Sequence, residues 1–354
     1  MTLADLGYTS VLEEYRKAHN LDAFEVGRVA SEHKDRYTIR TADQIYDAEL
    51  IGSLRFNAES RHDLPAVGDW VAFSVYDEQK ALIHAVFPRT SILERKAVGK
   101  SGQTQIIATN IDYGLIVQSV NRDFSINRLE RYLAICHAAG IEPIVLLSKT
   151  DLIETSEKET LVKQVIERLP HTSVYTISNQ TGEGIDGVRS QLEKGKTYCL
   201  LGSSGVGKST LINILTGKTL METGAISESI DRGKHVTTHR ELIPMEHGIL
   251  IDNPGMREVG ITHHEEGLEM TFDEITSIAA ECKFSDCSHQ TEAGCAVLKA
   301  IDEGVIPISA YENFMRMERE RQFLESDSLE RKRKEKSLGK MYKRVQEQRR
   351  KNKF

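Results

Sequence analysis

The segment GSSGVGKST, residues 202–210, constrains the fold more than any other part of the sequence. It matches the pattern G-x-x-x-x-G-K-[ST]. It follows the apolar run KTYCLL and precedes a helical pattern that begins at Lys208 and stops at Gly217. Glycines in that position let backbone N–H groups converge on phosphate oxygens, and the helix N-terminus adds a positive dipole end. A glycine loop that merely caps a helix is the alternative, but the flanking strand and helix favour a phosphate-binding loop, or P-loop.

The P-loop pattern assigns a role to its polar residues. Lys208 is expected to contact the β- and γ-phosphates of a nucleotide, and Ser209 to supply a hydroxyl to Mg²⁺. The pattern does not by itself choose between adenine and guanine nucleotides. The residues predicted to surround the phosphates are Gly202, Ser203, Ser204, Gly205, Val206, Gly207, Lys208, Ser209 and Thr210.

Strands and helices alternate between Ile106 and the P-loop. The apolar runs IDYGLIVQSV, IEPIVLLS and TSVYTIS alternate with the helical patterns INRLERYLAICHAAG and TSEKETLVKQVIERL. The first helical pattern places Ile126, Leu129, Leu133 and Cys136 on one face. This rhythm predicts a parallel sheet with helices on both faces.

A polar segment at the end of the strand IEPIVLLS points to guanine. Its members are Ser148, Lys149, Thr150 and Asp151. The Asp151 carboxylate can accept hydrogen bonds from guanine N1–H and from the 2-amino group. Adenine offers neither, so it would leave this carboxylate desolvated and unpaired. Lys149 can lay its stem along the purine face, although Lys-x-Asp is also common in ordinary polar turns.

The next predicted strand ends in TISN, residues 176–179, and supports the guanine interpretation. Backbone N–H groups near Ser178 and Asn179 can meet guanine O6. Ligands of open α/β sheets bind at the carboxyl ends of the strands, where both segments lie.

Two segments downstream of the P-loop resemble nucleotide switches. Asp252 ends the run LIDNPG and is expected to hold Mg²⁺ through water, while the Gly255 N–H would contact the γ-phosphate. Either Thr237 or Thr238 would complete the Mg²⁺ shell, and the pattern does not choose between them. His235 is a candidate to orient the attacking water; the alternatives are an RNA contact or an ordinary surface histidine.

The order of these motifs indicates a permuted domain. The base-reading segments precede the P-loop, whereas they follow it in most GTPases. From Gly202 to the first cysteine of the cluster near residue 282 there are only about 80 residues, too few for a whole P-loop sheet. Strands from upstream must therefore complete the sheet.

Residues 25–95 predict a separate small barrel of the OB type. The runs FEVGRVA, RYTIRT, DAELIGSL, VGDWVAFSV and KALIHAVF are short and strand-like, with polar turns between them. Such a barrel can bind oligonucleotides or serve as a plain scaffold. Residues 1–24 form a helical or irregular lead, and the polar stretch 94–105 is interpreted as a linker or mobile loop.

Three cysteines and a histidine cluster near the C-terminal end. Cys282, Cys287, His289 and Cys295 supply donors that suit tetrahedral zinc, and a complete protein shell is typical of structural sites. Reduced thiols without a metal are the alternative. Cys136 and Cys199 fall in apolar patterns and are interpreted as core residues.

Charge is distributed unevenly along the chain. Residues 331–354 carry twelve Lys or Arg and two Glu, so subtracting their +10 from the total of −7 leaves −17 on residues 1–330. A basic tail suggests a polyanionic partner, although it can also be a solvated helix end. The sequence has no apolar run of roughly 18 residues and no signal-peptide pattern, so we expect a cytoplasmic protein without a membrane partner.

Together these motifs resemble the circularly permuted GTPases of the RsgA (ribosome small subunit-dependent GTPase A) family over nearly the whole chain. The resemblance implies a GTPase stimulated by the small ribosomal subunit and its rRNA, acting late in maturation of that subunit. It also implies GTP/GDP with Mg²⁺ and one structural Zn²⁺. Two positions depart from the family pattern. Ser148 replaces the usual Asn or Thr, and a histidine-threonine-threonine-threonine run is replaced by His235, Val236, Thr237 and Thr238.

The expected architecture is therefore multidomain α/β, and we expect the free protein to be a monomer. The lead is followed by the OB-type barrel (25–95), a circularly permuted P-loop GTPase domain (106–265), a helical zinc-binding domain (266–330) and the basic tail (331–354). Two other functions fit parts of the sequence: a P-loop ATPase or kinase in which 148–151 is incidental, and an RNA-binding or scaffold protein in which nucleotide is mainly structural.

Met256 follows Gly255 at the position where Ras-like GTPases carry a water-orienting glutamine, so we expect slow intrinsic turnover.

Overall fold

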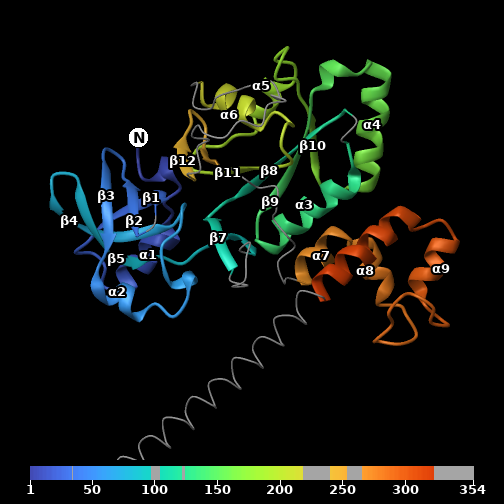
Figure 1. Cartoon of the computed structure of the whole chain (residues 1–354), viewed down its shortest axis with the longest axis horizontal. Coiled ribbons are helices and arrows are strands. Elements are labelled where there is room, and N and C mark those ends of the chain that lie inside the picture. The colour runs from blue at the N-terminus through green and yellow to red at the C-terminus, as the bar shows by residue number, and fades with distance from the viewer. Residues whose placement is uncertain (34, 97–103, 122–123, 218–239, 253–264, 323–354) are drawn as a thin grey trace, which may run out of the picture. The chain divides into compact units, whose positions relative to one another are not determined.

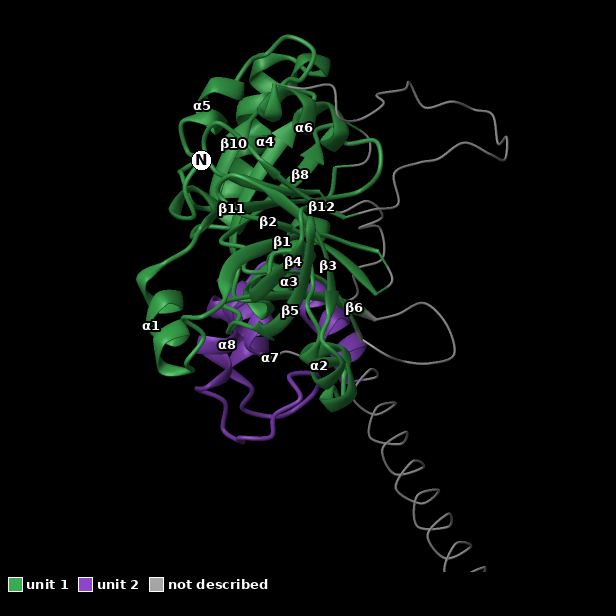
Figure 2. Cartoon of the chain, turned by 90° about the vertical axis from the view of Figure 1, so that its left-hand side faces the viewer, with its two compact units in different colours: residues 1–260 green, residues 261–354 purple. Residues whose placement is uncertain are grey.

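The computed structural model describes residues 1–33, 35–96, 104–121, 124–217, 240–252 and 265–322 (Figure 1). The chain divides into two compact units, Met1–Gly260 and Ile261–Phe354 (Figure 2). None of the helices in the described ranges is both long enough and apolar enough to cross a membrane.

A five-stranded barrel follows a helical lead. The lead contains η1 (Ala4–Leu6) and α1 (Ser10–Ala18). The barrel strands run in the order β1-β2-β3-β5-β4, and β4 pairs back to β1, so the barrel is closed. The β3–β5 pairing is parallel and the others are antiparallel. The strands are β1 (Glu25–His33), β2 (Arg36–Arg40), β3 (Ile45–Leu50), β4 (Trp70–Asp77) and β5 (Lys80–Val86).

Alternation of side chains explains why these short segments close around a core. In β2 and β3 every second residue points inward, and Tyr37, Ile39, Tyr46 and Ala48 are all buried. They pack with residues of β1, β4 and β5 in one apolar cluster. The connection from β3 to β4 contains α2 (Gly52–Asn57) and η2 (Arg61–Asp63). The predicted OB-type barrel is confirmed.

The P-loop strand lies in the middle of a mostly parallel sheet. The order is β10-β9-β8-β11-β13-β12; neighbours from β10 to β13 are parallel, and β12 is antiparallel to β13. The bounds are β8 (Tyr113–Ser119), β9 (Glu142–Ser148), β10 (Ser173–Thr176), β11 (Thr197–Leu201), β12 (Glu241–Pro244) and β13 (Ile249–Asp252). Besides β11, which leads directly into the P-loop, three of these strands precede it in the sequence, which confirms that upstream strands complete the sheet.

Helices cover both faces of this sheet, as predicted (Figure 1). One apolar cluster joins α3 and α4 to one face, and another joins α5 and α6 to the opposite face. Successive residues of β8 alternate between the clusters, because Ile116 belongs to the first and both Leu115 and Val117 to the second. The helices are α3 (Ile126–Ala138), α4 (Thr155–Arg168), α5 (Ile185–Arg189) and α6 (Lys208–Thr216).

The stretch between barrel and sheet differs from the expected linker. β6 (Ile92–Lys96) and β7 (Thr104–Thr109) pair antiparallel as a two-stranded sheet. The interpretation of 94–105 as a loop is therefore wrong at both ends. The polar residues Glu94, Arg95 and Gln105, which are half-buried, hid the β character of this stretch, although the neighbouring Leu93 and Ile106 are buried.

A buried arginine joins the lead, the barrel and the sheet. Arg28 of β1 is only 1% exposed, and its guanidinium donates hydrogen bonds to four segments: to the carbonyls of Leu6 (2.8 Å), Gly68 (3.0 Å) and Asn110 (2.9 Å), and to Thr197 Oγ1 (2.8 Å). Burial lowers the pKa of Arg28 to about 10, so the group remains charged at neutral pH. Thr197 begins β11, so the barrel and the P-loop strand share one rigid joint.

The second unit is helical in its described part. It contains α7 (Glu265–Thr271), α8 (Asp273–Ala279), α9 (Ala296–Asp302) and helical residues 308–322. Phe272, Ile275 and Val297 are buried, and the Phe272 ring meets Phe314 edge-on at 5.4 Å. A small apolar core therefore supports the loop that carries the cysteine cluster.

Replacing Arg28 tests the joint. We expect Arg28→Met to lower the free energy of unfolding of the first unit by about 2–4 kcal/mol, because several buried acceptors lose their donor. Trp70, the only tryptophan, is buried with its ring 5.7 Å from the guanidinium, so its fluorescence during urea denaturation reports on this region. Arg36→Met is the control because the Arg36 side chain is 82% exposed. Equal effects of the two substitutions would contradict the role of Arg28.

Candidate nucleotide site and metal centre

The P-loop folds as a glycine-dependent turn between β11 and α6. Gly202, Gly205 and Gly207 all have positive φ angles, of 140°, 79° and 99°. A Cβ atom at Gly202 would lie 2.2 Å from the carbonyl oxygen of Val117 in the neighbouring strand, so only glycine fits there. The sequence therefore carries glycine where the loop turns sharply against the sheet.

Lys208 extends back over this loop from the first position of α6. Its Nζ donates hydrogen bonds to the carbonyl oxygens of Gly202 (2.7 Å) and Ser203 (2.5 Å). The ammonium group thus lies over the turn formed by the loop, where a phosphate would be attracted to it.

Hydrogen bonds hold the predicted base-reading segments together. Ser178 Oγ donates to Asp151 Oδ1 at 2.5 Å. Ser178 Oγ also accepts from the backbone N–H groups of Gln180 (3.2 Å) and Thr181 (3.1 Å). Lys149 adopts a left-handed conformation, with φ of 62°, where the chain leaves β9. The segments 148–151 and 178–181, far apart in the sequence, therefore form one hydrogen-bonded edge.

The same edge is tied to the P-loop. Ser148 is fully buried and its Oγ donates to the Val206 carbonyl at 2.7 Å. Asn179 Nδ2 donates to the Gly207 carbonyl at 2.9 Å. The sequence predicts only a backbone contact for Asn179, because no local pattern signals that its side chain reaches a residue 28 positions away.

Tyr132 is a second residue that the sequence did not reveal. It lies on α3 among apolar neighbours, so its pattern is that of a core residue. Burial raises the pKa of Tyr132, and its interaction with the side chain of Ser203 in the P-loop lowers that pKa in part. The helix therefore supports the loop through a polar contact as well as through packing.

The magnesium and switch residues are described only in part. Asp252 ends β13, which pairs in parallel with β11 through Cys199 and Ile251, so Asp252 lies at the same carboxyl edge as the P-loop. The roles of Ser209 and Asp252 remain predictions. His235, Thr237, Thr238 and Gly255 lie outside the described residues.

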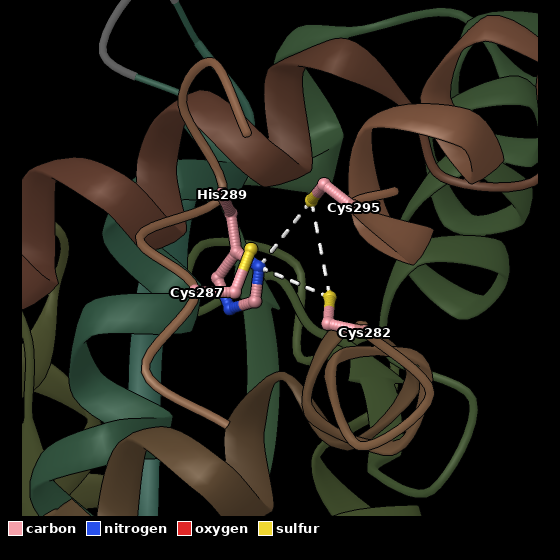
Figure 3. A group of neighbouring side chains, drawn as sticks. All are labelled: Cys282, Cys287, His289 and Cys295. Atoms are coloured by element: carbon pink, nitrogen blue, oxygen red, sulfur yellow. Dashed lines mark hydrogen bonds between the residues drawn. The ribbon is translucent and has the colours of Figure 1, made fainter. Parts of the chain in front are cut away.

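The cysteine cluster gathers four donor atoms in the second unit (Figure 3). The donors of Cys282, Cys287, His289 and Cys295 all lie within 4.8 Å of one another. Cys282 Sγ is 3.9 Å from Cys295 Sγ and 3.6 Å from His289 Nδ1, and Cys295 Sγ is 3.5 Å from His289 Nδ1. A tetrahedral ion with metal–sulfur bonds of about 2.3 Å needs ligand separations of about 3.5–3.8 Å. The residues therefore fit such an ion.

Backbone N–H groups point to two of the three thiols. The N–H groups of Ala296 and Leu298, at the start of α9, point to Cys282 Sγ (3.3 Å) and Cys295 Sγ (3.4 Å). Burial raises the pKa of Cys282, but hydrogen bonds from Ala296 and Val297 outweigh it, so the pKa lies below the usual thiol value. Burial also lowers the pKa of His289, which favours the neutral imidazole that metals bind.

Glu292 shapes the loop between the ligands. Its carboxylate accepts hydrogen bonds from the backbone N–H of Ser288, Gln290 and Thr291 and from the Ser288 hydroxyl. The Ser288 hydroxyl and the Thr291 N–H lower its pKa to about 2. A carboxyl group of lowered pKa stabilises the folded loop above its ordinary pKa of 4.5 and loses that contribution as the pH falls towards 2. At neutral pH this stabilisation is complete.

Comparison with known proteins identifies the family. A sequence model described as RsgA GTPase matches residues 86–262. The protein named small ribosomal subunit biogenesis GTPase RsgA from Opitutus terrae is 39% identical over 335 residues, which cover 91% of this chain and 90% of that protein. This chain belongs to the RsgA GTPase family.

Other family members and solved structures agree with this result. The protein named small ribosomal subunit biogenesis GTPase RsgA 2 from Listeria monocytogenes is 40% identical over 325 residues, covering 90% of this chain and 89% of that protein. The crystal structure of YjeQ from Thermotoga maritima superposes with a TM-score of 0.64 at 25% identity, covering 84% of this chain and 98% of that chain. YloQ, whose structure is described as a circularly permuted GTPase, gives a TM-score of 0.64 at 25% identity, covering 86% and 97%. These matches confirm the predicted permuted fold.

Removing the charge of Glu292 tests the metal centre. We expect Glu292→Gln to release bound Zn²⁺ to a chromogenic chelator roughly tenfold faster, because the amide replaces one of the two oxygens that accept hydrogen bonds from this loop and removes the charge. Glu303→Gln is the control, since Glu303 is an exposed residue at the end of α9 and bonds to Lys299 on the surface. If both variants release zinc at the wild-type rate, the loop does not depend on Glu292.

Proposed function

We propose that this protein is a Mg²⁺-dependent GTPase that hydrolyses GTP to GDP and phosphate and acts in late maturation of the small ribosomal subunit. The observation that carries the proposal is the hydrogen-bonded union of the Asp151 and Ser178 segments with the P-loop. Membership of the RsgA GTPase family supports it, as do relatives named small ribosomal subunit biogenesis GTPase.

Specificity for guanine would come from the edge formed by β9 and β10. Asp151 would accept hydrogen bonds from guanine N1–H and the 2-amino group, while Lys149 and Thr150 line the base. The Asn179 N–H would donate to O6, because the Ser178 N–H already donates to the Glu183 carbonyl at 2.9 Å. Because Ser178 Oγ fixes the Asp151 carboxylate at 2.5 Å, the acceptor is oriented before the base arrives.

The phosphates would be bound by the P-loop. Its N–H groups and the Lys208 ammonium would neutralise the negative charge, and the Gly255 N–H would contact the γ-phosphate. Ser209, one of Thr237 and Thr238, and Asp252 through water would hold Mg²⁺. When bound, this ion neutralises charge on the β- and γ-phosphates.

The attacking water has no glutamine to orient it, because Met256 follows Gly255. We therefore propose slow intrinsic turnover, with His235 orienting the water once the small subunit is bound. We also propose that Cys282, Cys287, His289 and Cys295 hold one structural Zn²⁺. A complete protein shell leaves that ion no open position for catalysis.

The proposed partner is the small ribosomal subunit, contacted through its rRNA and partly through the basic tail 331–354. We expect the free protein to be a monomer and to meet its partner in the cytoplasm. A polyanionic partner bound through Lys and Arg makes the association weaken steeply with salt.

Steady-state hydrolysis tests the function directly. Turnover of GTP is measured with and without purified small subunits at two salt concentrations, with ATP as the control substrate. We expect strong stimulation that weakens with salt, and little turnover of ATP. Equal turnover with and without subunits would remove the ribosome from the mechanism, and equal use of ATP would favour a P-loop ATPase.

Asp151→Asn should change base specificity. The amide loses one acceptor for guanine but can donate to the 2-oxo group of xanthine. We expect GTP affinity to fall by at least tenfold and xanthosine triphosphate to become the better ligand, as measured by competition against labelled GDP. Glu154→Gln is the control because Glu154 is an exposed residue beyond the same turn. Unchanged GTP preference in Asp151→Asn would show that this carboxylate does not read the base.

His235→Ala separates the proposed catalytic role from its alternatives. We expect the subunit-stimulated rate to fall about 10²-fold or more while the affinity for the subunit is kept, because only orientation of the water is lost. Both quantities are measured on the same subunit preparation. Unchanged stimulated turnover would exclude His235 from the mechanism, and a loss of affinity alone would indicate an RNA contact.

A further inference from the structure

Two adjacent carbonyl groups of the P-loop are held by side chains from two different strands. The Val206 carbonyl accepts from Ser148 Oγ (2.7 Å), at the end of β9. The next carbonyl, that of Gly207, accepts from Asn179 Nδ2 (2.9 Å), beyond the end of β10. The phosphate-binding loop is thus tethered at consecutive peptides to the two segments that would read the base.

The Gly207 peptide is a sensitive point of the loop. Gly207 is the N-cap of α6, and its carbonyl also accepts the first helical hydrogen bond, from Leu211 N at 3.0 Å. A carbonyl has two lone pairs, so both donors can be accommodated. A Cβ atom at Gly207 would lie 2.7 Å from Asn179 Nδ2, which shows how closely the side chain approaches the backbone. Asn179 therefore helps to fix the peptide from which the helix starts.

The loop that carries Asn179 is itself rigid. Ser178 N donates to the Glu183 carbonyl and Gly182 N to the Ser178 carbonyl, each at 2.9 Å. The Ser178 hydroxyl uses its proton on Asp151 and accepts from the N–H groups of Gln180 and Thr181. Asn179 is therefore presented by a segment whose position is set by the guanine-reading carboxylate.

The chemistry fixes which end of the amide faces the P-loop. A backbone carbonyl can only accept, so the NH₂ end of Asn179 must face Gly207. Asn179 Oδ1 is then buried, with no hydrogen-bond partner among the described residues. A buried acceptor without a partner has a cost, and the amide keeps this orientation because the alternative would set two oxygens against each other.

We propose that the Asn179 side chain is a positioning residue that locks the guanine-reading loop to the P-loop. This role rests on the proposed nucleotide site and adds to it, because the Asn179 side chain acts on the phosphates through the Gly207 peptide, whereas its backbone N–H would contact the base. Loss of the amide frees that peptide to rotate, and the adjoining N–H groups are no longer aimed at the phosphates. Affinity falls for every nucleotide, while the choice of base remains with Asp151.

The test measures equilibrium binding and dissociation of fluorescently labelled GDP, with inosine diphosphate as a competitor whose base lacks the 2-amino group. We expect Asn179→Ala to weaken both nucleotides by the same factor, about 3- to 10-fold, through faster dissociation. The ratio of GDP to inosine diphosphate affinity stays at the wild-type value. Asn179→Asp keeps the shape but has no donor, so we expect it to lose at least as much affinity. Gln180→Ala, an exposed neighbour in the same loop, is the control and should bind as the wild type does.

Three results would overturn the proposal. Wild-type binding by both Asn179 variants would show that the tether has no effect on the loop. Wild-type binding by Asn179→Asp alone would assign the residue a packing role. A falling ratio of GDP to inosine diphosphate affinity would make Asn179 a direct reader of the base. Absence of GDP binding by the wild-type protein would instead refute the nucleotide site itself. The fluorescence of the buried Trp70 during urea denaturation shows whether each variant is folded.

Discussion

A guanidinium group taken out of water must have its hydrogen bonds satisfied by protein, and this requirement organises the first unit. Arg28 meets it only because the lead, the β-barrel, the residue that follows β7 and the start of β11 converge on one point. The barrel strand β1 also continues the large sheet by pairing with β12 at Ser31 and Glu241. The barrel and the P-loop strand consequently belong to one framework, and the nucleotide site is built on a rigid base.

Much of this architecture could be predicted from the sequence because it depends on local patterns. The P-loop glycines, the alternation of strands with helices and the spacing of the cysteine cluster each lie within a short segment. The closed barrel also followed from short runs with alternating side chains. The order of the motifs was enough to require a permuted sheet, since the segment after the P-loop is too short to form one.

What the sequence did not reveal are contacts between residues far apart in the chain. Arg28 and Thr197 are separated by 169 positions, and Ser148 and Val206 by 58. Nothing in the neighbourhood of Asn179 distinguishes an amide that reaches the P-loop from one that faces water. Ser148 was a departure from the family pattern, yet its hydroxyl reaches the P-loop carbonyl directly. Such contacts depend on how strands are ordered in the sheet, which single-residue patterns do not encode.

The permutation also determines how mechanical load would pass through the molecule. The chain leaves the sheet at Asp252, the last residue of β13, and the second unit begins at Ile261. A force applied to the second unit is therefore transmitted to a strand that is hydrogen-bonded on both sides, to β11 and to β12. When β13 is pulled along its axis, the hydrogen bonds to both neighbouring strands are loaded in shear, so they resist the tension together. The chain that leads to the second unit therefore leaves the sheet from a strand with neighbours on both sides, beside the strand that leads into the P-loop.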